Sequence, residues 1–312
     1  MKYTRTLTAT AIAVMLLALI LSAPCLSAPP PMSSTEMLTT LEKTLYGNPV
    51  EGAIIPRVAA LEAVILGKAG EGTLTERVSR LWDQLGGGRE GVLSLDYKIK
   101  LAQWIVNGKI KQGSLMERLA ALEDVLFGYV SKESLPARIE RMVEITTGID
   151  GVDAAYAKLA AGTAVKVVIR TGMKSSSTRP GDKVVLEVSE DVYIGDRLAI
   201  PSGTQWTSEA ADPTKSGRYD LKNLLELILE PVLAIDGTPV RLYVDDNAAT
   251  ATQILTGLLI CQGDRPERLG FFALGTAVDR LLPGSKNLDI INGTKIILSV
   301  REDVSVVSAK VK

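Results

Sequence analysis

The sequence LTERVSRLWDQLGG occupies residues 74–87. The same pattern returns as LMERLAALEDVLFG at residues 115–128 and as LPARIERMVEITTG at residues 135–148. Each copy ends on a glycine, and six such glycines follow one another at intervals of 20, 20, 21, 20 and 20 residues. These repeat glycines are Gly47, Gly67, Gly87, Gly108, Gly128 and Gly148. A fixed period of this length is typical of helical repeats, in which each unit buries its apolar face against other copies.

Within each copy the apolar residues follow 4-3-4 steps, as at positions 115, 119, 122 and 126, which places them on one face of a helix. Helix starts are marked by Ser33, Thr73 and Ser114, each three residues before a glutamate, as in a capping box. The repeat glycines stand where a left-handed residue closes a helix. We therefore predict six amphipathic helices of about 13 residues, joined by links of about six.

A basic residue stands before the second apolar position of five copies. These basic repeat positions are Arg57, Arg77, Lys98, Arg118 and Arg138. One interpretation is a basic stripe that binds an anionic envelope polymer. The other is a solvated flank whose side-chain stems cover the apolar face, and interleaved acidic residues favour it. The copy that contains Ala102 and Trp104 is irregular and one residue longer, which indicates a bend, a docking point or a drifted copy.

After Gly162 the apolar period changes to two, and short valine-rich runs predict strands at residues 164–170, 183–188 and 241–244. Glycine- and proline-containing turns separate them. Residues 150–161 are predicted as a short helix or linker. Residues 221–229 fit a helix or a strand, and residues 248–260 fit a helix or an exposed insertion. The predicted fold class is α plus β in separate domains. An N-terminal array of short helices precedes a mainly-β sandwich or barrel.

Two distant segments of the β half echo each other. KVVLEVSEDVYI at residues 183–194 and KIILSVREDVSV at residues 295–306 share six of twelve positions. Alternation places positions 184, 186 and 188 on one face of the first strand, and positions 296, 298 and 300 on the matching face of the second. We predict that both faces are buried in one β-domain and that Ser299 lies on the opposite face. Direct pairing of the two strands is left open.

The N-terminus has the layout of a secretory signal peptide: Lys2 and Arg5, an apolar run over residues 9–21, then small residues and prolines. We predict cleavage between about Ser22 and Ala28, with an uncleaved membrane anchor as the alternative. Both imply export to the periplasm or cell envelope. A cleaved form would keep Cys261 as its only cysteine, so no intramolecular disulfide is expected.

Composition argues against several classes of function. The 35 basic and 36 acidic residues nearly cancel, which gives no basic face for nucleic acid. Histidine, the commonest general base and metal ligand, is absent from the sequence. The remaining candidates for acid–base or metal chemistry are the pairs Glu190-Asp191, Asp245-Asp246 and Glu302-Asp303. Neighbours on a strand point to opposite faces, so these pairs fit strand-end turns better. We expect no enzyme activity, no catalytic residue, no cofactor and no metal.

The helical copies resemble the L-x-x-R-L-x-x-L-E repeats of exported bacterial envelope proteins. The β half resembles a domain common in exported bacterial proteins and is similar to the β-barrel domain of type IV secretion outer-core subunits. The resemblance is carried by Ser176-Ser177, Gly181-Asp182 and Val184; by Asp191-Val192, Ile200-Pro201 and Gly203-Thr204; and by Asp236-Gly237-Thr238, Val240 and Leu242.

The resemblance implies fold and compartment rather than chemistry. We therefore predict a non-enzymatic structural or interaction protein of the cell envelope, with the helical array as scaffold and the β-domain as docking module. The alternative is a periplasmic component of a secretion or export apparatus that oligomerises through its β-domain. The expected partners are envelope proteins or further copies of the chain, with membrane contact only through an uncleaved leader. The predicted organisation is a signal peptide (1–28), a helical repeat region (33–148), a linker (149–162) and a β-domain (163–312).

Overall fold

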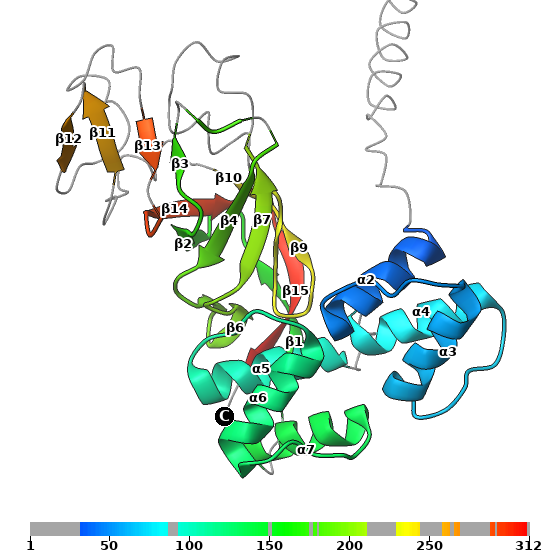
Figure 1. Cartoon of the computed structure of the whole chain (residues 1–312). Helices are drawn as coiled ribbons and strands as arrows, with labels where there is room; N and C mark the ends of the chain where they lie inside the picture. Colours follow the sequence, from blue (N-terminus) through cyan, green and yellow to red (C-terminus); the bar gives the residue numbers. More distant parts are fainter. Residues whose placement is uncertain are drawn as a thin grey trace, which may run out of the picture. The chain divides into compact units, whose positions relative to one another are not determined.

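The computed structural model describes residues 32–86, 93–148, 152–174, 177–179, 181–210, 229–243, 258–262, 265–268, 288–290 and 292–310. Within these ranges six helices precede a β-rich region, which confirms the predicted fold class (Figure 1). The predictions for the leader, Gly87, residues 221–228 and the pair Asp245-Asp246 lie outside the described residues.

The helices follow the predicted repeat. They are α2 (Ser34–Tyr46), α3 (Ile54–Ile65), α4 (Leu74–Leu85), α5 (Leu95–Asn107), α6 (Leu115–Phe127) and α7 (Leu135–Thr147). Thr73 and Ser114 form complete capping boxes at α4 and α6, as predicted. Gly67 and Gly128 have φ angles of 71° and 73°, the left-handed conformation that ends these helices.

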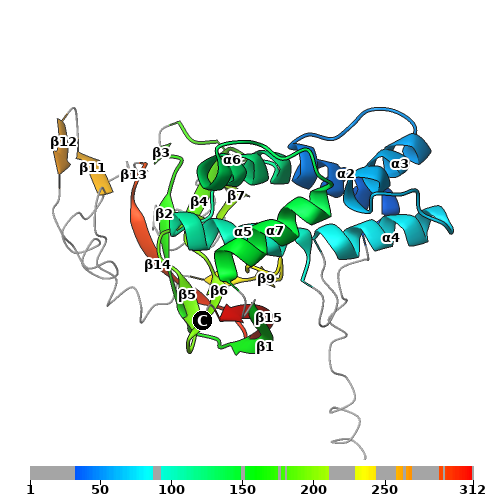
Figure 2. The same cartoon turned by 90° about the horizontal axis from the view of Figure 1, so that it is seen from below.

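One hydrophobic core joins all six helices. Each contributes its apolar stripe, from Leu38 in α2 to Met142 in α7. Helix α2 contacts α4 and α6 as well as its neighbour α3, and α5 contacts α7. The packing therefore goes beyond the nearest-neighbour contacts of an open solenoid. Figure 2 shows the six helices gathered together.

The β region contains several antiparallel sheets. One has the strand order β1-β15-β6-β5 and another the order β10-β14-β2-β4-β7; β12-β11-β13-β3 and β8-β9 form two smaller ones. The strands are β1 (Asp153–Leu159), β2 (Ala164–Ile169), β3 (Met173–Lys174), β4 (Lys183–Val188), β5 (Val192–Ile194), β6 (Arg197–Ile200), β7 (Gln205–Glu209), β8 (Val232–Leu233), β9 (Pro239–Val240), β10 (Leu242–Tyr243), β11 (Leu258–Gln262), β12 (Arg265–Arg268), β13 (Leu288–Ile290), β14 (Lys295–Val300) and β15 (Val304–Lys310).

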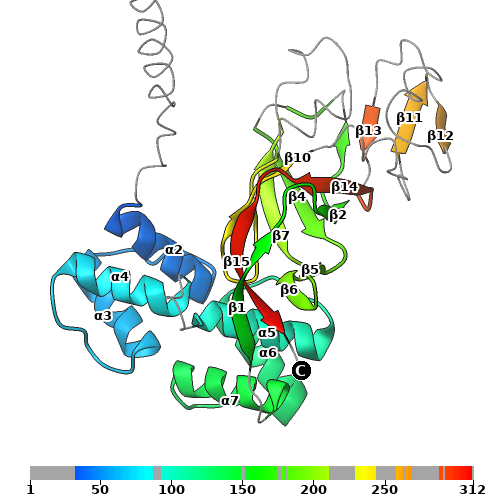
Figure 3. The same cartoon turned by 180° about the vertical axis from the view of Figure 1, so that it is seen from behind.

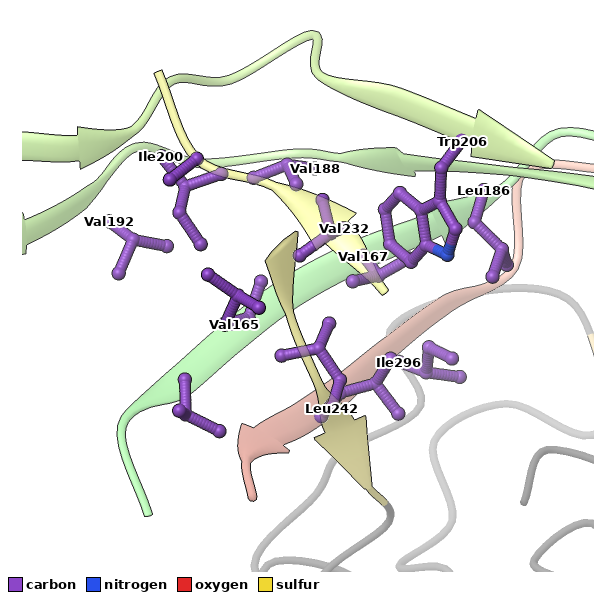
Figure 4. Close-up of a cluster of buried hydrophobic side chains, with 14 of the residues drawn as sticks. Val165, Val167, Leu186, Val188, Val192, Ile200, Trp206, Val232, Leu242 and Ile296 are labelled. Carbon is purple, nitrogen blue, oxygen red and sulfur yellow. The ribbon is translucent and has the colours of Figure 1, made fainter. Parts of the chain in front are cut away.

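The β core is built by alternation along the strands. Leu186 and Val188 of β4, Val165 and Val167 of β2, and Ile296 of β14 all point into it (Figure 4). The predicted burial of positions 184, 186, 188, 296, 298 and 300 is confirmed. The two echoed strands are not paired directly, because β2 lies between β14 and β4 in the sheet.

Two sequence predictions are wrong. Residues 153–159 form strand β1 rather than a short helix or linker, since their seven backbone positions pair with β15 in continuous register. Ser299 is only 2% exposed, although we expected it on an open face. It pairs with both Ala164 of β2 and Tyr243 of β10, in a central strand buried on both sides at this end.

The β region contains an internal duplication of a turn, in which β4 is equivalent to β2 and not to its sequence echo β14. At the end of β4, Val188 donates to the carbonyl of Thr204 and accepts from the amide of Gly203, both at 2.8 Å. At the end of β2, Ile169 exchanges the same two bonds with Thr294 and Gly293, again at 2.8 Å. The neighbouring register repeats as well: Val192 pairs with Ile200, and Met173 with Ile290. The turns at Gly203 and Gly293 are therefore equivalent.

Candidate functional site

The basic repeat positions join neighbouring helices. Arg57, Arg77 and Arg138 each bind a glutamate 15 residues earlier, through Nε and Nη2, at distances between 2.6 and 2.9 Å. The partners are Glu42, Glu62 and Glu123, whose side chains are 0–2% exposed. We call each such pair a clamp. Neither sequence interpretation is correct for these three arginines, because they are neither a solvated flank nor free to bind a polymer.

Each clamp also holds the loop between its two helices. The amide of Val50 donates to Glu42 at 3.0 Å, and that of Ser131 to Glu123 at 3.3 Å. The backbone of Gly70 does the same for Glu62. The interleaved acidic residues indicated a solvated flank, whereas their constant 15-residue distance from the arginines is the signal of these pairs.

Two of the clamps lower the pKa of their carboxyl groups. Hydrogen bonds from Arg77 lower the pKa of Glu62 below its ordinary value, against the opposing effect of burial. Burial acts most strongly on Glu42 and would raise its pKa, but the bonds from Arg57 and Val50 outweigh it and lower the pKa. Glu42 and Glu62 therefore stay ionised in the folded protein at neutral pH.

Helix α5 connects the helices to the β region. Its residues Ile99 and Ala102 belong to the helical core. On its other side, Tyr97 and Leu101 form a separate buried cluster with Leu198 of β6, Ile235 and Ala309 of β15. Figure 3 shows α5 beside β6. The irregular copy is thus a docking point, one of the alternatives that the sequence left open.

Trp104 fixes this junction through Asp191. Its indole Nε1 donates to Asp191 Oδ2 at 2.8 Å, while the amide of Ser202 donates to Oδ1 at 2.7 Å. The hydroxyl of Tyr193 is a third donor, at 3.2 Å. This carboxylate, a candidate for acid–base chemistry in the sequence, therefore has a positioning role in the fold.

The loop after α5 packs against the turn that contains Gly203. The amide of Ile110 donates to the carbonyl of Ser202 at 2.9 Å, and Ser202 Oγ donates to the carbonyl of Gly108 at 3.1 Å. Gln112 Nε2 donates to the carbonyl of Gly203 at 2.8 Å. A Cβ at Gly203 would lie 2.2 Å from the carbonyl oxygen of Ile110, so no side chain fits there. We call this contact the loop–turn dock.

Two titratable groups on α5 are perturbed by burial. Burial raises the pKa of Tyr97 well above its ordinary value, and the nearby charge of Asp236 raises it further. Burial would also raise the pKa of Asp96, but Lys100 and Arg118 outweigh this effect and lower it well below its usual range. The raised pKa keeps Tyr97 neutral, and the lowered pKa keeps Asp96 ionised.

The other acidic residues that the sequence offered as candidates form ion pairs with lysine and arginine side chains at the surface. Glu190 pairs with Lys166, Glu302 with Arg241, and Asp303 with Lys158 at 2.5 Å. Among the residues with described positions, no cluster of three or more potential metal ligands occurs. Five of the six repeat glycines have positive φ angles at helix ends, and Gly87 is outside the described ranges.

Comparison with known proteins gives one solved structure of note. No protein-family profile matches the chain, and no curated protein matches it. The structure of ComB10 of the Com type IV secretion system of Helicobacter pylori is similar over 47% of this chain and 90% of ComB10. The identity is 16% and the TM-score is 0.28, values that do not establish a common function. No helix in the described ranges is both long enough and apolar enough to span a membrane.

Proposed function

We propose that this chain is a non-enzymatic structural or interaction protein of the bacterial cell envelope. The helices form its scaffold and the β region is its docking module. The main support is the structural role of the distinctive sequence motifs. The repeat glycines end helices, the arginines at positions 57, 77 and 138 clamp helices together, and the turn at Gly203 joins the two regions. Motif residues of an enzyme converge on one site, whereas these are distributed over the joints of a framework.

Placement in the periplasm or cell envelope rests on the leader. Lys2 and Arg5 precede an apolar run and a segment of small residues and prolines, the arrangement that directs export. Rigid helical and β scaffolds with exposed loops suit protein–protein contacts, since binding loses little conformational entropy.

The test combines localisation with partner capture. Cell fractionation and mass spectrometry of the mature N-terminus should find the chain in the envelope fraction, cut between about Ser22 and Ala28. A photo-crosslinking residue at Val125, which is 63% exposed, should then capture envelope proteins. The matched control is the same variant without residues 1–28, which should remain in the cytoplasm and lose these partners. Intact chain in the cytoplasm would overturn the proposal, and capture of secretion subunits would favour the secretion-apparatus alternative.

A further inference from the structure

The loop that forms the loop–turn dock recurs after α2, α3 and α6. Of these copies, the one after α6 has a large apolar residue with an amide, Val130, where the docked loop has Ile110; the others have Pro49 and Ala69 there. Helices α5 and α6 end alike: Gly108 has φ 69° and ψ 3°, and Gly128 has φ 73° and ψ 12°. The amide of each glycine bonds to the carbonyl four residues earlier, at 2.8 and 2.9 Å. Residues 108–114 and 128–134 then follow the same sequence of bends before the next helix. By this alignment Val130 is the equivalent of Ile110.

These two loops differ in what covers them. Ile110 is 6% exposed because it contacts the β region, whereas Val130 is 51% exposed, as is the neighbouring Tyr129. The exposed loop at residues 128–134 is fixed by Glu123, which binds both the amide of Ser131 and the side chain of Arg138. It is therefore a preformed surface of the same shape as the docked loop.

The turn of the loop–turn dock also has a second copy, at Gly293. Gly203 and Gly293 make the same two hydrogen bonds to the end of a strand and have φ angles of 80° and 93°. A Cβ at Gly203 would collide with the docked loop, but one at Gly293 meets no described atom within 4 Å. Asn292 before it is exposed. Both halves of the dock thus occur a second time, without the contact that joins the first pair.

We propose that the loop at residues 128–132 of one molecule docks on the turn at Asn292-Gly293 of a second copy of this chain. The polar groups required are present in equivalent places. The amide of Val130 faces the carbonyl of Asn292, as Ile110 faces Ser202 in the dock within the chain. The amide nitrogen of Asn292 replaces the Ser202 hydroxyl as donor to the loop glycine, and Lys132 replaces Gln112 as donor to the turn glycine.

The occupant is a second copy because this chain carries, outside its internal dock, a further copy of both parts of that dock. The contact is heterologous, since a loop on one molecule meets a turn on the next, and it leads to rings or filaments rather than two-fold dimers. This self-association adds a partner, a second copy of the chain, to the proposed scaffold role. Only its significance in the cell rests on that proposed role.

Cysteine pairing between two molecules tests the contact directly. The full chain is used with both native cysteines, Cys25 and Cys261, replaced by serine. Mixing the Val130→Cys and Asn292→Cys variants should give a disulfide-linked dimer that neither variant gives alone. A positive control is Ile110→Cys combined with Ser202→Cys in one chain. This variant should form an intramolecular disulfide if the loop–turn dock is correct. The negative control pairs Asn292→Cys with a cysteine at Ile55, an exposed position on α3.

Sedimentation velocity provides an independent readout. The purified chain should associate with increasing concentration, and Val130→Asp should weaken the association about tenfold or more, as expected at an interface centre. Circular dichroism verifies that the variant remains folded. A chain that stays monomeric, or crosslinking no greater than in the negative control, would overturn the inference. Because these measurements use purified protein, their failure leaves the envelope proposal standing, and mislocalisation in cells would leave the association intact.

Discussion

The clamp between Glu62 and Arg77 permits a quantitative prediction, because its two members differ in burial. The glutamate side chain is fully buried and that of the arginine is 16% exposed. Arg77→Ala removes both hydrogen bonds and leaves a buried carboxylate without its counter-ion. Removal of one partner from a buried pair costs about 3–5 kcal/mol. Glu62→Ala leaves an arginine that can reach water, so its cost should be nearer the 1–3 kcal/mol of an unsatisfied group, about half as much.

The effect should also depend on pH. Because the clamp lowers the folded-state pKa of Glu62, its contribution to stability is complete above the unfolded pKa of about 4.3 and is lost as pH falls through the lower folded value. Arg77→Ala removes this lowering and leaves the carboxyl buried, so protonation favours the folded variant. The difference in unfolding free energy between wild type and Arg77→Ala should therefore be largest at pH 7 and shrink in acid.

Urea unfolding of the full chain, followed by circular dichroism at pH 7 and in acid, measures both effects. Lys183→Ala is the matched surface control: it breaks an ion pair with Glu209 whose members are 65% and 60% exposed, and such pairs are worth about 0.2–1 kcal/mol. If Arg77→Ala costs no more than Lys183→Ala, or if Glu62→Ala costs more than Arg77→Ala, the explanation from differential burial is wrong.

Three further predictions concern glycines and the β core. Gly128→Val should lower the free energy of unfolding by about 1–2 kcal/mol, because a β-branched residue fits poorly at φ 73°; an unchanged urea midpoint would contradict this. Gly203→Ala should destabilise the chain far more than Gly293→Ala, since both have positive φ but only the first would collide with the docked loop; equal thermal midpoints would refute the loop–turn dock. Leu298→Asp should abolish soluble expression, because an unpaired buried carboxylate costs several kcal/mol, about the stability of a domain. Ile297→Asp, at a half-buried position of the same strand, should be tolerated better.

Local patterns in the sequence were sufficient to predict the helices. The 4-3-4 spacing, the caps at Thr73 and Ser114 and the glycines act within one turn of the chain, so they specify the helices without tertiary information. Strand β1 was missed because Asp153–Leu159 has weak alternation and depends on pairing with β15, about 150 residues later in the chain. Pairing of this kind is a non-local property that composition does not encode.

The candidate site was predictable in its parts but not in its contacts. Trp104 and the turn at Gly203 were both noticed in the sequence as features of separate halves. Nothing in the residue types indicated that the indole would donate to Asp191. The clamps were closer to prediction, because a glutamate and an arginine 15 residues apart recur within a period of about 20 residues, the length of one helix and its link.

Helix α5 lacks a clamp on both sides. The positions equivalent to a clamp are Trp82 and Lys98 between α4 and α5, and Gln103 and Arg118 between α5 and α6. Gln103 is 1% exposed, and within the described part of the chain its Oε1 and the Nε of Arg118 have no hydrogen-bond partner. Each such unsatisfied group costs about 1–3 kcal/mol, although Arg118 still joins α6 to α5 through an ion pair with Asp96.

The contacts with the β region offset that deficit. Trp104 gains a charge-assisted hydrogen bond, Leu101 is fully buried beside β6, and the backbone of Ile110 packs against the turn at Gly203. A bidentate clamp fixes the angle between two helices, whereas α5 has to satisfy the helical core and the β region together. Replacement of the clamps at α5 by amide and aromatic side chains therefore lets the position of this helix be set by the β region. For this reason the irregular copy of the repeat, rather than a regular one, forms the junction.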